Sequence, residues 1–385
     1  MSRVLTKNEI TNVLNGATLL GGGGGGSLSD GIKMLDKLPD TVTLNLIEPK
    51  EMDPDKYIGI TAGMGAPSMI EKIDFTPYAV NSFNALKKLA SEMDPPRTIT
   101  YCMALECGGF NTFVPMLNAI SLNLPYVDAD GSGRAVPTLP TLLLNVNGCD
   151  TSPLGMANGN NDTVYIMTQD SKNAALCEDL GRNVCVAFGS VSGIAGWMVK
   201  QDEVLGKLVP YAVTQLETIG SIIRNTYPYW DIFSALKAKG VELKALGRGK
   251  IILKKIEEKG GFDLGTTEIF DPSTGYTWTI NFQNENLIIY YTQPGHQEKI
   301  PYMTAPDIIC MYDLNTGTPL TNADTEEGME VAFGVMPVAK QWWNGGVDYA
   351  YSFWKQYIQM FGYTGPCLTY SNLKELDIEE AVADA

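Results

Sequence analysis

The segment RTITYCMALECGGFNTFVPMLNAISLNLPYVDADGSGR, from Arg97 to Arg134, contains a strand, a helix and a second strand in succession. Residues 97–104 are rich in β-branched and apolar side chains, which favours a strand. Residues 113–122 carry apolar side chains at the spacing of a helix, and the next strand begins at 126–127. A crossover of this length joins strands that run parallel in one sheet.

The same alternation extends along the first 240 residues. Strands are predicted at 41–47 and 57–62, and an amphipathic helix at 81–93. Further helices are predicted at 7–15, from Ser29 to about 38, at 207–224 and at 230–239, with a strand at 183–190 and an apolar segment at 192–200. The sequence therefore predicts a Rossmann-like α/β domain with a mostly parallel sheet, in which ligands bind beyond the carboxyl ends of the strands.

After Gly240 the pattern changes to short alternating runs separated by turns such as PSTG, Pro272–Gly275. These runs lie at 251–255, 262–270, 276–282, 286–291, 307–313 and 330–336. Such a series is typical of a β-meander or barrel. We therefore expect an α/β domain at 1–240, a smaller barrel-like domain at 241–335, and a C-terminal segment at 336–385 that ends in an acidic tail.

Composition narrows the class of partner. The 385 residues include 28 basic and 44 acidic side chains, a formal net charge of −16. A nucleic-acid binder needs a basic surface, and an anionic membrane repels an acidic protein. There is no run of about 18 apolar residues, no apolar signal core, and an odd number of widely spaced cysteines, seven. We expect a cytoplasmic protein that binds a small molecule, with no nucleic-acid or membrane partner.

The chain has one histidine, His296, in a Pro-Gly turn that we expect to be exposed. Metal sites built from several histidines are therefore excluded. Any acid–base catalysis is expected to use carboxylates, cysteine, tyrosine or lysine. The sequence requires no cofactor. A divalent metal held by carboxylates stays open because no diagnostic ligand set is present.

The six glycines Gly21–Gly26 follow a short apolar run, Ala17–Leu20, which we interpret as a strand, and precede a helix. Backbone N–H groups of Gly23, Gly24, Gly25 and Gly26 at a helix N-terminus suit an anion such as a substrate carboxylate. A flexible connection is the alternative. The run also matches a dinucleotide fingerprint, with Glu48 at the place of a ribose-binding acid, although six glycines satisfy many spacings.

A second polar segment is Glu106–Asn111, ECGGFN, at the end of a predicted strand. Glu106 and Asn111 offer an acceptor and an amide, and Gly108 and Gly109 let the backbone approach a ligand. Cys107 is a candidate nucleophile if a helix N-terminus lowers its pKa, and otherwise a small buried thiol.

The third polar segment is DADGSGR, Asp128–Arg134. Asp128 and Asp130 share one face of a strand, where two close carboxylates form an acid–base pair or hold a cation. Arg134 is suited to bind a carboxylate through two hydrogen bonds. An Asp-rich turn closed by an ion pair is the structural alternative. Asn158, in ANGNND, belongs to a polar cluster that by itself indicates a hairpin loop.

Seven segments together resemble a known family, the S-methyl thiohydantoin desulfurases. They are GATLLGGGGGG (16–26), MGAPSMIEK (64–72), ECGGFN (106–111), PYVDADGSGRAVP (125–137), SPL (152–154), PDIICMYDLNTGTP (306–319) and EEGMEVAF (326–333). The resemblance implies a Rossmann-like domain joined to a smaller β-barrel-like domain. It also implies hydrolysis of a cyclic S-methyl isothiourea to hydantoin and methanethiol. The family's AD..GN element is represented by Ala157-Asn158-Gly159-Asn160, with Asn in place of Asp and a shorter spacing.

Our leading hypothesis is a hydrolase that acts on a C–S or C–N bond of such a ring. Asp128 or Asp130 would deprotonate water, and the other, or Glu106, would protonate the leaving group. Arg134 and the glycine loop would hold the substrate. Two alternatives stay open: a nucleotide-dependent enzyme that uses Gly21–Gly26 and Glu48, and a ligand-binding protein without catalysis, which the departure at Asn158 favours. A homo-oligomer is common for acidic α/β proteins of this size.

Overall fold

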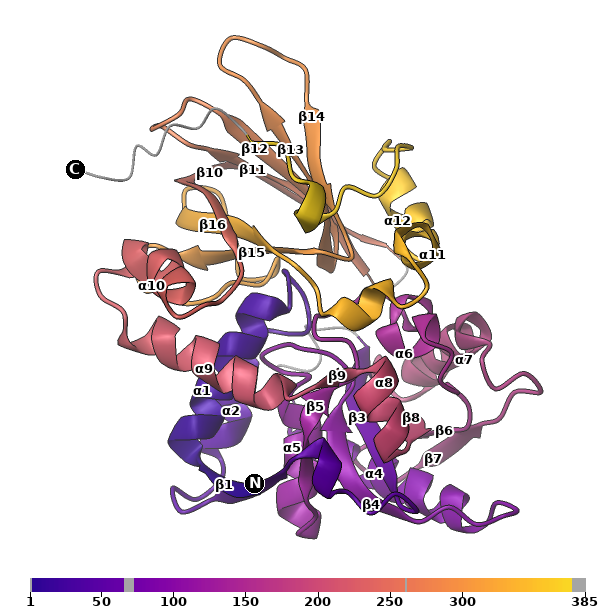
Figure 1. Cartoon of the computed structure of the whole chain (residues 1–385). Helices are drawn as coiled ribbons and strands as arrows, with labels where there is room; N and C mark the ends of the chain where they lie inside the picture. The colour runs from indigo at the N-terminus through magenta and orange to yellow at the C-terminus, as the bar shows by residue number, and fades with distance from the viewer. Residues whose placement is uncertain (1, 66–72, 260–261, 376–385) are drawn as a thin grey trace.

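The computed structural model describes residues 2–65, 73–259 and 262–375, and two sheets organise the chain (Figure 1). The first sheet, in the lower part of Figure 1, has the strand order β1-β2-β5-β4-β3-β8-β6-β7, with β9 paired to β5. Its strands are β1 (Arg3–Thr6), β2 (Thr43–Ile47), β3 (Tyr57–Gly65), β4 (Ile99–Ala104), β5 (Tyr126–Asp130), β6 (Leu154–Ala157), β7 (Thr163–Ile166), β8 (Val191–Val199) and β9 (Val209–Pro210).

The centre of this sheet is parallel. Strands β2, β5, β4 and β3 run in one direction, and helices at 76–91 and 113–122 form the crossovers from β3 to β4 and from β4 to β5. Strands β1, β8, β6, β7 and β9 are added antiparallel. The predicted α/β architecture is confirmed, with the parallel arrangement in the centre of the sheet and antiparallel strands around it. The helix from Phe113 to Leu122 has the predicted bounds.

The longer helices pack around the first sheet. They are α1 (Lys7–Leu20), α2 (Leu28–Asp36), α4 (Thr76–Ser91), α5 (Phe113–Leu122), α7 (Ala174–Ala187) and α9 (Ala212–Asn225); the shorter ones are α6 (Leu143–Val146), α8 (Gln201–Lys207), α10 (Ile232–Ala238), α11 (Val347–Ser352) and α12 (Lys355–Gln359). Helices α4 and α5 contact each other and the strands β3 and β4, while α1 lies alongside α9.

Two predicted strands are wrong. Ala17–Leu20 forms the last turn of α1, and 183–187 forms the end of α7. In α1 every residue from Val13 to Leu20 is buried, so the sequence there reads as an apolar run rather than as an amphipathic helix. In α7 the buried residues include Cys177, Gly181 and Cys185, which repeat at helical spacing although β-branched residues lie between them.

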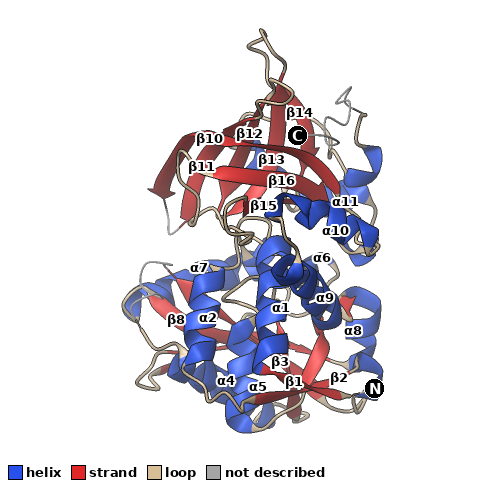
Figure 2. Ribbon diagram, turned by 90° about the vertical axis from the view of Figure 1, so that its left-hand side faces the viewer, coloured by secondary structure: helices blue, strands red, loops and turns tan. Residues whose placement is uncertain are grey.

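The second sheet is antiparallel and curled, with the order β14-β13-β12-β11-β10-β16-β15 (Figure 2). Its strands are β10 (Lys244–Lys259), β11 (Phe262–Phe270), β12 (Thr277–Gln283), β13 (Glu285–Thr292), β14 (Ile300–Thr304), β15 (Ile308–Asp313) and β16 (Glu330–Met336). A core of its own forms around Trp278, Ile280 and Phe333. The barrel-like prediction is confirmed as an open half-barrel.

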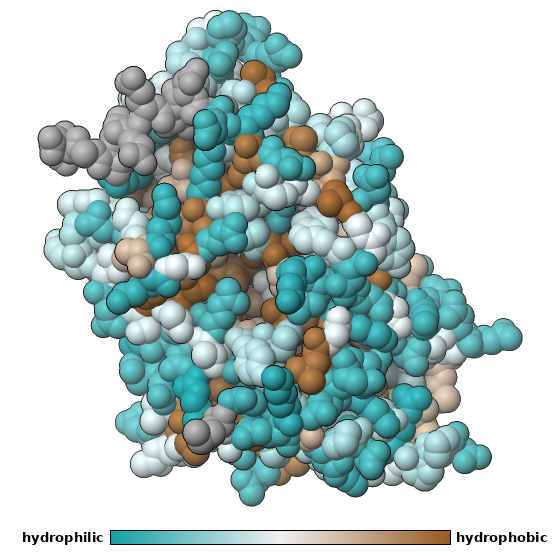
Figure 3. Space-filling model, in the orientation of Figure 1, coloured by the Kyte–Doolittle hydropathy of each residue, from teal (hydrophilic) through white to brown (hydrophobic). Residues whose placement is uncertain are grey.

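The segment after Met336, which the sequence left unplaced, returns to the first sheet. Trp342 is fully buried, and its indole N–H donates to the Ser132 carbonyl at 2.8 Å. The hydroxyls of Tyr357 and Thr138 are hydrogen-bonded at 2.8 Å. Figure 3 shows apolar residues gathered along the region where the two halves meet. Within the part of the chain described, no helix is long and apolar enough to cross a membrane.

Candidate functional site

A cavity of about 220 Å³ lies between the two sheets. The first sheet contributes the carboxyl ends of β3 and β4 through Gly63–Gly65 and Leu105–Glu106. The glycine loop, Gly23–Gly26, lines it from a second side. The second sheet contributes Asp263, Asn284–Glu285 and Thr321–Asp324. The cavity therefore lies beyond the strand ends, where parallel sheets bind ligands, and both sheets supply its walls.

The glycine loop is packed tightly between the two sheets. A Cβ atom on Gly24 would lie 1.9 Å from Glu285 Oε1, and one on Gly25 would lie 2.4 Å from the Cys107 carbonyl oxygen. The carbonyl oxygens of Gly22 and Gly23 accept hydrogen bonds from Asn286 and Asn322, both at 2.8 Å. The loop is thus a fixed wall of the cavity. Among the described residues, none accepts a hydrogen bond from the N–H of Gly23 or Gly26.

The setting of this loop differs from that of a dinucleotide-binding turn. The loop connects helix α1 to helix α2, whereas the dinucleotide fingerprint follows a strand. Glu48, the candidate for a ribose contact, directly follows β2 and is not among the residues that line the cavity. The expected strand–loop–helix context was wrong because Ala17–Leu20 belongs to α1.

Glu106 follows β4 and lines the cavity with only 7% of its surface exposed. Its Oε1 accepts from the Asn111 amide at 2.7 Å, and its Oε2 accepts from the Val136 N–H at 2.8 Å. The Asn111 oxygen in turn accepts from the Gly63 N–H at 3.1 Å. Burial outweighs these hydrogen bonds and raises the pKa of Glu106 to about 7.

Glu285 begins β13 and reaches the same cavity from the second sheet. It is 3% exposed, and among the described residues its Oε2 has no hydrogen-bond partner. Burial, followed by the nearby negative charge of Glu106, raises the pKa of Glu285 well above its usual range. The sequence reasoning missed this residue. In the sequence, Glu285 is a charged residue between two predicted strands, 276–282 and 286–291. That position by itself indicated only a turn.

Asp130 and Cys107 lie behind Glu106 and do not line the cavity. Asp130 Oδ1 accepts from the N–H groups of Ser132 and Gly133, at 2.8 and 2.6 Å. The Cys107 thiol lies beside this carboxyl group. Burial raises the pKa of Asp130 to about 6, and burial together with Asp130 raises that of Cys107 well above its usual range. A thiol kept protonated is a poor nucleophile.

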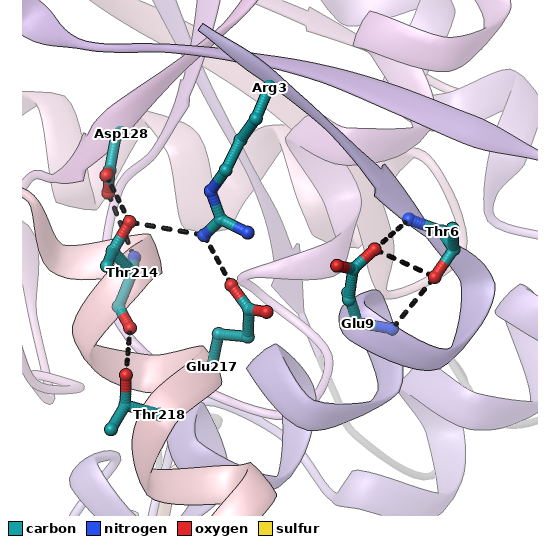
Figure 4. A network of polar contacts seen from close by, with 7 residues as sticks. All are labelled: Arg3, Thr6, Glu9, Asp128, Thr214, Glu217 and Thr218. Carbon is teal, nitrogen blue, oxygen red and sulfur yellow. Dashed lines mark hydrogen bonds and ion pairs between the residues drawn. The ribbon is translucent and has the colours of Figure 1, made fainter. Parts of the chain in front are cut away.

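Asp128 belongs to another network, shown in Figure 4. Its two oxygens accept from the N–H and hydroxyl of Thr214, at 3.0 and 2.6 Å, at the start of α9. Arg3 donates to the same hydroxyl at 3.3 Å and forms an ion pair with Glu217. Asp128 does not line the cavity, and the structure does not bring it together with Asp130 in one site.

Arg134 is completely buried and does not line the cavity. Its guanidinium donates to the carbonyls of Ala135, Pro306, Asp307 and Asn286. Its charge also stacks over the Trp354 ring, 4.7 Å from the centroid. We predicted that the guanidinium N–H groups of Arg134 bind a substrate carboxylate. In the structure they bind backbone carbonyl groups of both sheets instead.

The remaining predicted residues have structural contacts outside the cavity lining. Asn158 caps the β6–β7 turn, where its Oδ1 accepts from the N–H groups of Asn160 and Asp162, both at 3.0 Å. Gly108 packs against Gly25, and Gly109 packs against the start of α2. Of the predicted site residues, the cavity brings together Gly23, Gly24, Gly25, Gly26, Glu106 and Asn111.

The cavity also contains ionisable residues that the sequence reasoning missed. These are Asp30, Glu178, Arg182, Asp263 and Asp324. No spacing in the sequence connects them, because they come from α2, α7, strand β11 and the turn between β15 and β16. Among the described residues, no group of three or more His, Cys, Asp or Glu side chains has the arrangement needed to hold a metal.

Comparisons with known proteins agree with this architecture. The crystal structure of a protein from Chromobacterium violaceum has a TM-score of 0.80 to this chain at 22% identity, over 96% of this chain and 100% of the other. At this identity the likeness concerns the fold. No protein with a curated description matches. Two family models match in succession, the S-Me-THD-like N-terminal domain over residues 8–168 and the S-Me-THD-like C-terminal domain over 171–348. The chain therefore belongs to the S-Me-THD-like family.

Proposed function

We propose that this protein hydrolyses a small cyclic S-methyl thiohydantoin, releasing hydantoin and methanethiol. The observation that carries the proposal is the pair of buried carboxyl groups, Glu106 and Glu285, which face one cavity from the two sheets. Burial raises the pKa of Glu106 to about 7 and that of Glu285 well above its usual range, and we assign the carboxylate role to Glu106 and the carboxylic acid role to Glu285. Such a difference assigns a base and an acid. Family membership supports a hydantoin-related substrate.

The reaction needs both forms. In the first step, Glu106 takes a proton from water while the water oxygen bonds to the ring carbon that carries the methylthio group. Glu285 protonates the adjacent ring nitrogen, which receives the electron pair of the C=N bond. In the second step, the carbon–sulfur bond breaks and the thiolate takes the proton from Glu106. The new hydroxyl returns a proton to Glu285 as it becomes the hydantoin carbonyl, and both residues regain their starting states.

The cavity suits a substrate of this size and polarity. Its volume, about 220 Å³, is below the roughly 300–1,000 Å³ of sites for drug-sized ligands. Ala62, Met64, Leu105 and Phe110 form an apolar side next to Glu106, which suits a methylthio group. The N–H groups of Gly23 and Gly26 are donors suited to a ring carbonyl oxygen.

The test is product analysis by NMR with an S-methyl thiohydantoin in water enriched in ¹⁸O. We expect methanethiol and a hydantoin that carries one heavy oxygen, and we expect neither product from the Glu106→Gln variant. A ring-opened ureido acid would assign C–N hydrolysis to the same cavity and refute the desulfurase reaction. Binding of the substrate without turnover by folded protein would instead establish a ligand-binding protein.

A further inference from the structure

Apart from Glu106, the charged residues that the first-sheet side of the cavity shows in the described part of the chain are paired. Asp30 lies 3.3 Å from Lys33, and Glu178 lies 2.7 Å from Arg182. The Arg182 guanidinium also stacks 4.3 Å over the Phe262 ring. Among the described residues, the net charge of this side therefore comes from Glu106, and Arg182 is already held by a carboxylate and a ring.

The opposite side, which we call the acidic wall, consists of Asp263, Glu285 and Asp324. Asp324 Oδ2 accepts from the N–H and the hydroxyl of Thr321, at 2.9 and 2.6 Å. Asp263 is fixed through its backbone N–H, which donates to Asn284 Oδ1 at 2.9 Å. Within the described residues, no lysine or arginine nitrogen lies within 4 Å of any of the three carboxyl groups.

Lys254 is the cation beside the two aspartates, and it offsets their charge only in part. Its ammonium donates to the Thr267 hydroxyl at 3.1 Å and to Asn322 Oδ1 at 3.5 Å, and it lies 4.2 Å over the Phe282 ring. Burial lowers the pKa of Lys254 to about 7 despite the nearby aspartates. One lysine with a lowered pKa does not neutralise two aspartates, so the acidic wall keeps a negative charge.

Glu285 adds an independent indication of a ligand at this wall. Glu285 lines the cavity, and its Oε2 is buried and has no hydrogen-bond partner among the described residues. A buried polar atom without a hydrogen-bond partner is unfavourable. A bound molecule with a polar group at this position would satisfy it.

We propose that the acidic wall selects substrates whose ring carries a cationic side chain, an ammonium or a guanidinium. This inference rests on the proposed function for the chemistry of the ring, and it names the substrate class. The ring lies against Glu106 and Glu285, and the cation extends to Asp263 and Asp324, where charge-assisted hydrogen bonds hold it. A substrate with a carboxylate side chain is repelled by the same two aspartates.

The experiment compares three S-methyl thiohydantoins that carry 4-aminobutyl, butyl or carboxyethyl at the same ring carbon. We expect kcat/KM for the aminobutyl compound to exceed that for the butyl compound by about tenfold or more, with the carboxyethyl compound slowest. In the Asp263→Asn/Asp324→Asn double variant this ratio falls toward one. The ratio is taken within each protein, so a partial loss of folded enzyme cancels.

The matched control is Asp55→Asn, which removes one negative charge from an exposed residue before the amino end of β3, at the opposite end of that strand from the cavity. It should keep both the activity and the preference.

Binding of the three corresponding hydantoins, measured by calorimetry, separates the two proposals. Preferred binding of the aminobutyl hydantoin without any turnover would support the acidic wall and refute the reaction. Turnover of all three compounds without a preference for the cation would refute the wall alone, and neither turnover nor binding would refute both.

Discussion

Two buried carboxyl groups near the cavity are bound differently, and their contacts decide which one can do chemistry. Asp130 Oδ1 accepts from two backbone N–H groups, and the carboxyl group lies beside the Cys107 thiol. Glu106 accepts one bond from a backbone N–H and one from an amide, and it faces the cavity. Asp130 therefore stabilises the turn after β5 and adds negative charge behind Glu106, while Glu106 is placed to exchange a proton with a ligand.

We expect Glu106→Gln to lower kcat/KM at least about 100-fold, because an amide cannot take a proton from water. The wild-type rate should rise with pH through about 7 as Glu106 ionises, and the variant should show no such rise. The measurement is a pH profile of methanethiol release. Glu48→Gln is the control, since Glu48 follows β2 and lies outside the cavity lining. A variant that keeps both the rate and the profile would remove Glu106 from the mechanism.

The same pKa shift predicts a change in stability. The pKa of Glu106 is higher in the folded protein, about 7, than its ordinary value of 4.5. The folded state therefore binds the proton more tightly than the unfolded state does. Protonated Glu106 adds to the free energy of unfolding at low pH, and this contribution is lost as pH rises from about 4.5 through 7. The shift corresponds to about 3 kcal/mol for this fully buried group. Denaturant unfolding at pH 5 and pH 8 should show a smaller loss in Glu106→Gln than in wild type, and equal losses would contradict the shift.

At the scale of elements, the glycine loop places the second sheet against the first. Gly24 allows Glu285 to approach, and Gly25 packs on Gly108. Gly24 does not have a positive φ, so a side chain there tests the contact without adding backbone strain. Close packing against its neighbours therefore fixes the position of the loop.

We expect Gly24→Ala to destabilise the protein by about 1–3 kcal/mol, since the added methyl overlaps Glu285. It should also lower kcat/KM because Glu285 must move. Gly206→Ala is the matched control. Gly206 lies in α8 with nothing within 4 Å of an added Cβ, so alanine should stabilise by about 0.5–1 kcal/mol. Urea unfolding and steady-state rates compare the two, and a neutral Gly24→Ala variant would contradict the tight packing.

Local patterns in the sequence predicted the elements better than the site. The strand–helix–strand unit at 97–134 and the strands after Gly240 were predicted because each depends on side chains a few residues apart. Glu106 and Asn111 were predicted as site residues because they lie in a polar segment that follows a strand. Glu285 was missed because its meeting with Glu106 depends on how the two sheets pack, and no local period encodes a contact between residues so distant in sequence.

At the scale of the whole molecule, the two sheets form a joint structure around Arg134. Its guanidinium binds carbonyls of both sheets, and Trp354, from the C-terminal segment, covers it. The two family models divide the chain near residue 170, whereas the two sheets divide it between β9 and β10, near residue 240. Residues matched by the C-terminal model therefore complete the first sheet, which makes an independent fold of either half unfavourable.

We expect Arg134→Lys to destabilise the protein by about 3 kcal/mol or more. A lysine ammonium has three donors and no planar face, so it cannot bind these carbonyls and stack on Trp354 together, and a buried charge is left with too few partners. Because Arg134 Nη2 lies 3.4 Å from the carbonyl oxygen of Asn286, next to Glu285, kcat/KM should fall as well. Arg97→Lys, a partly exposed arginine over Tyr57, is the control and should change either quantity little. Thermal unfolding with parallel rate measurements would decide, because a stable and fully active Arg134→Lys variant would mean that the two sheets hold Glu285 in place without this arginine.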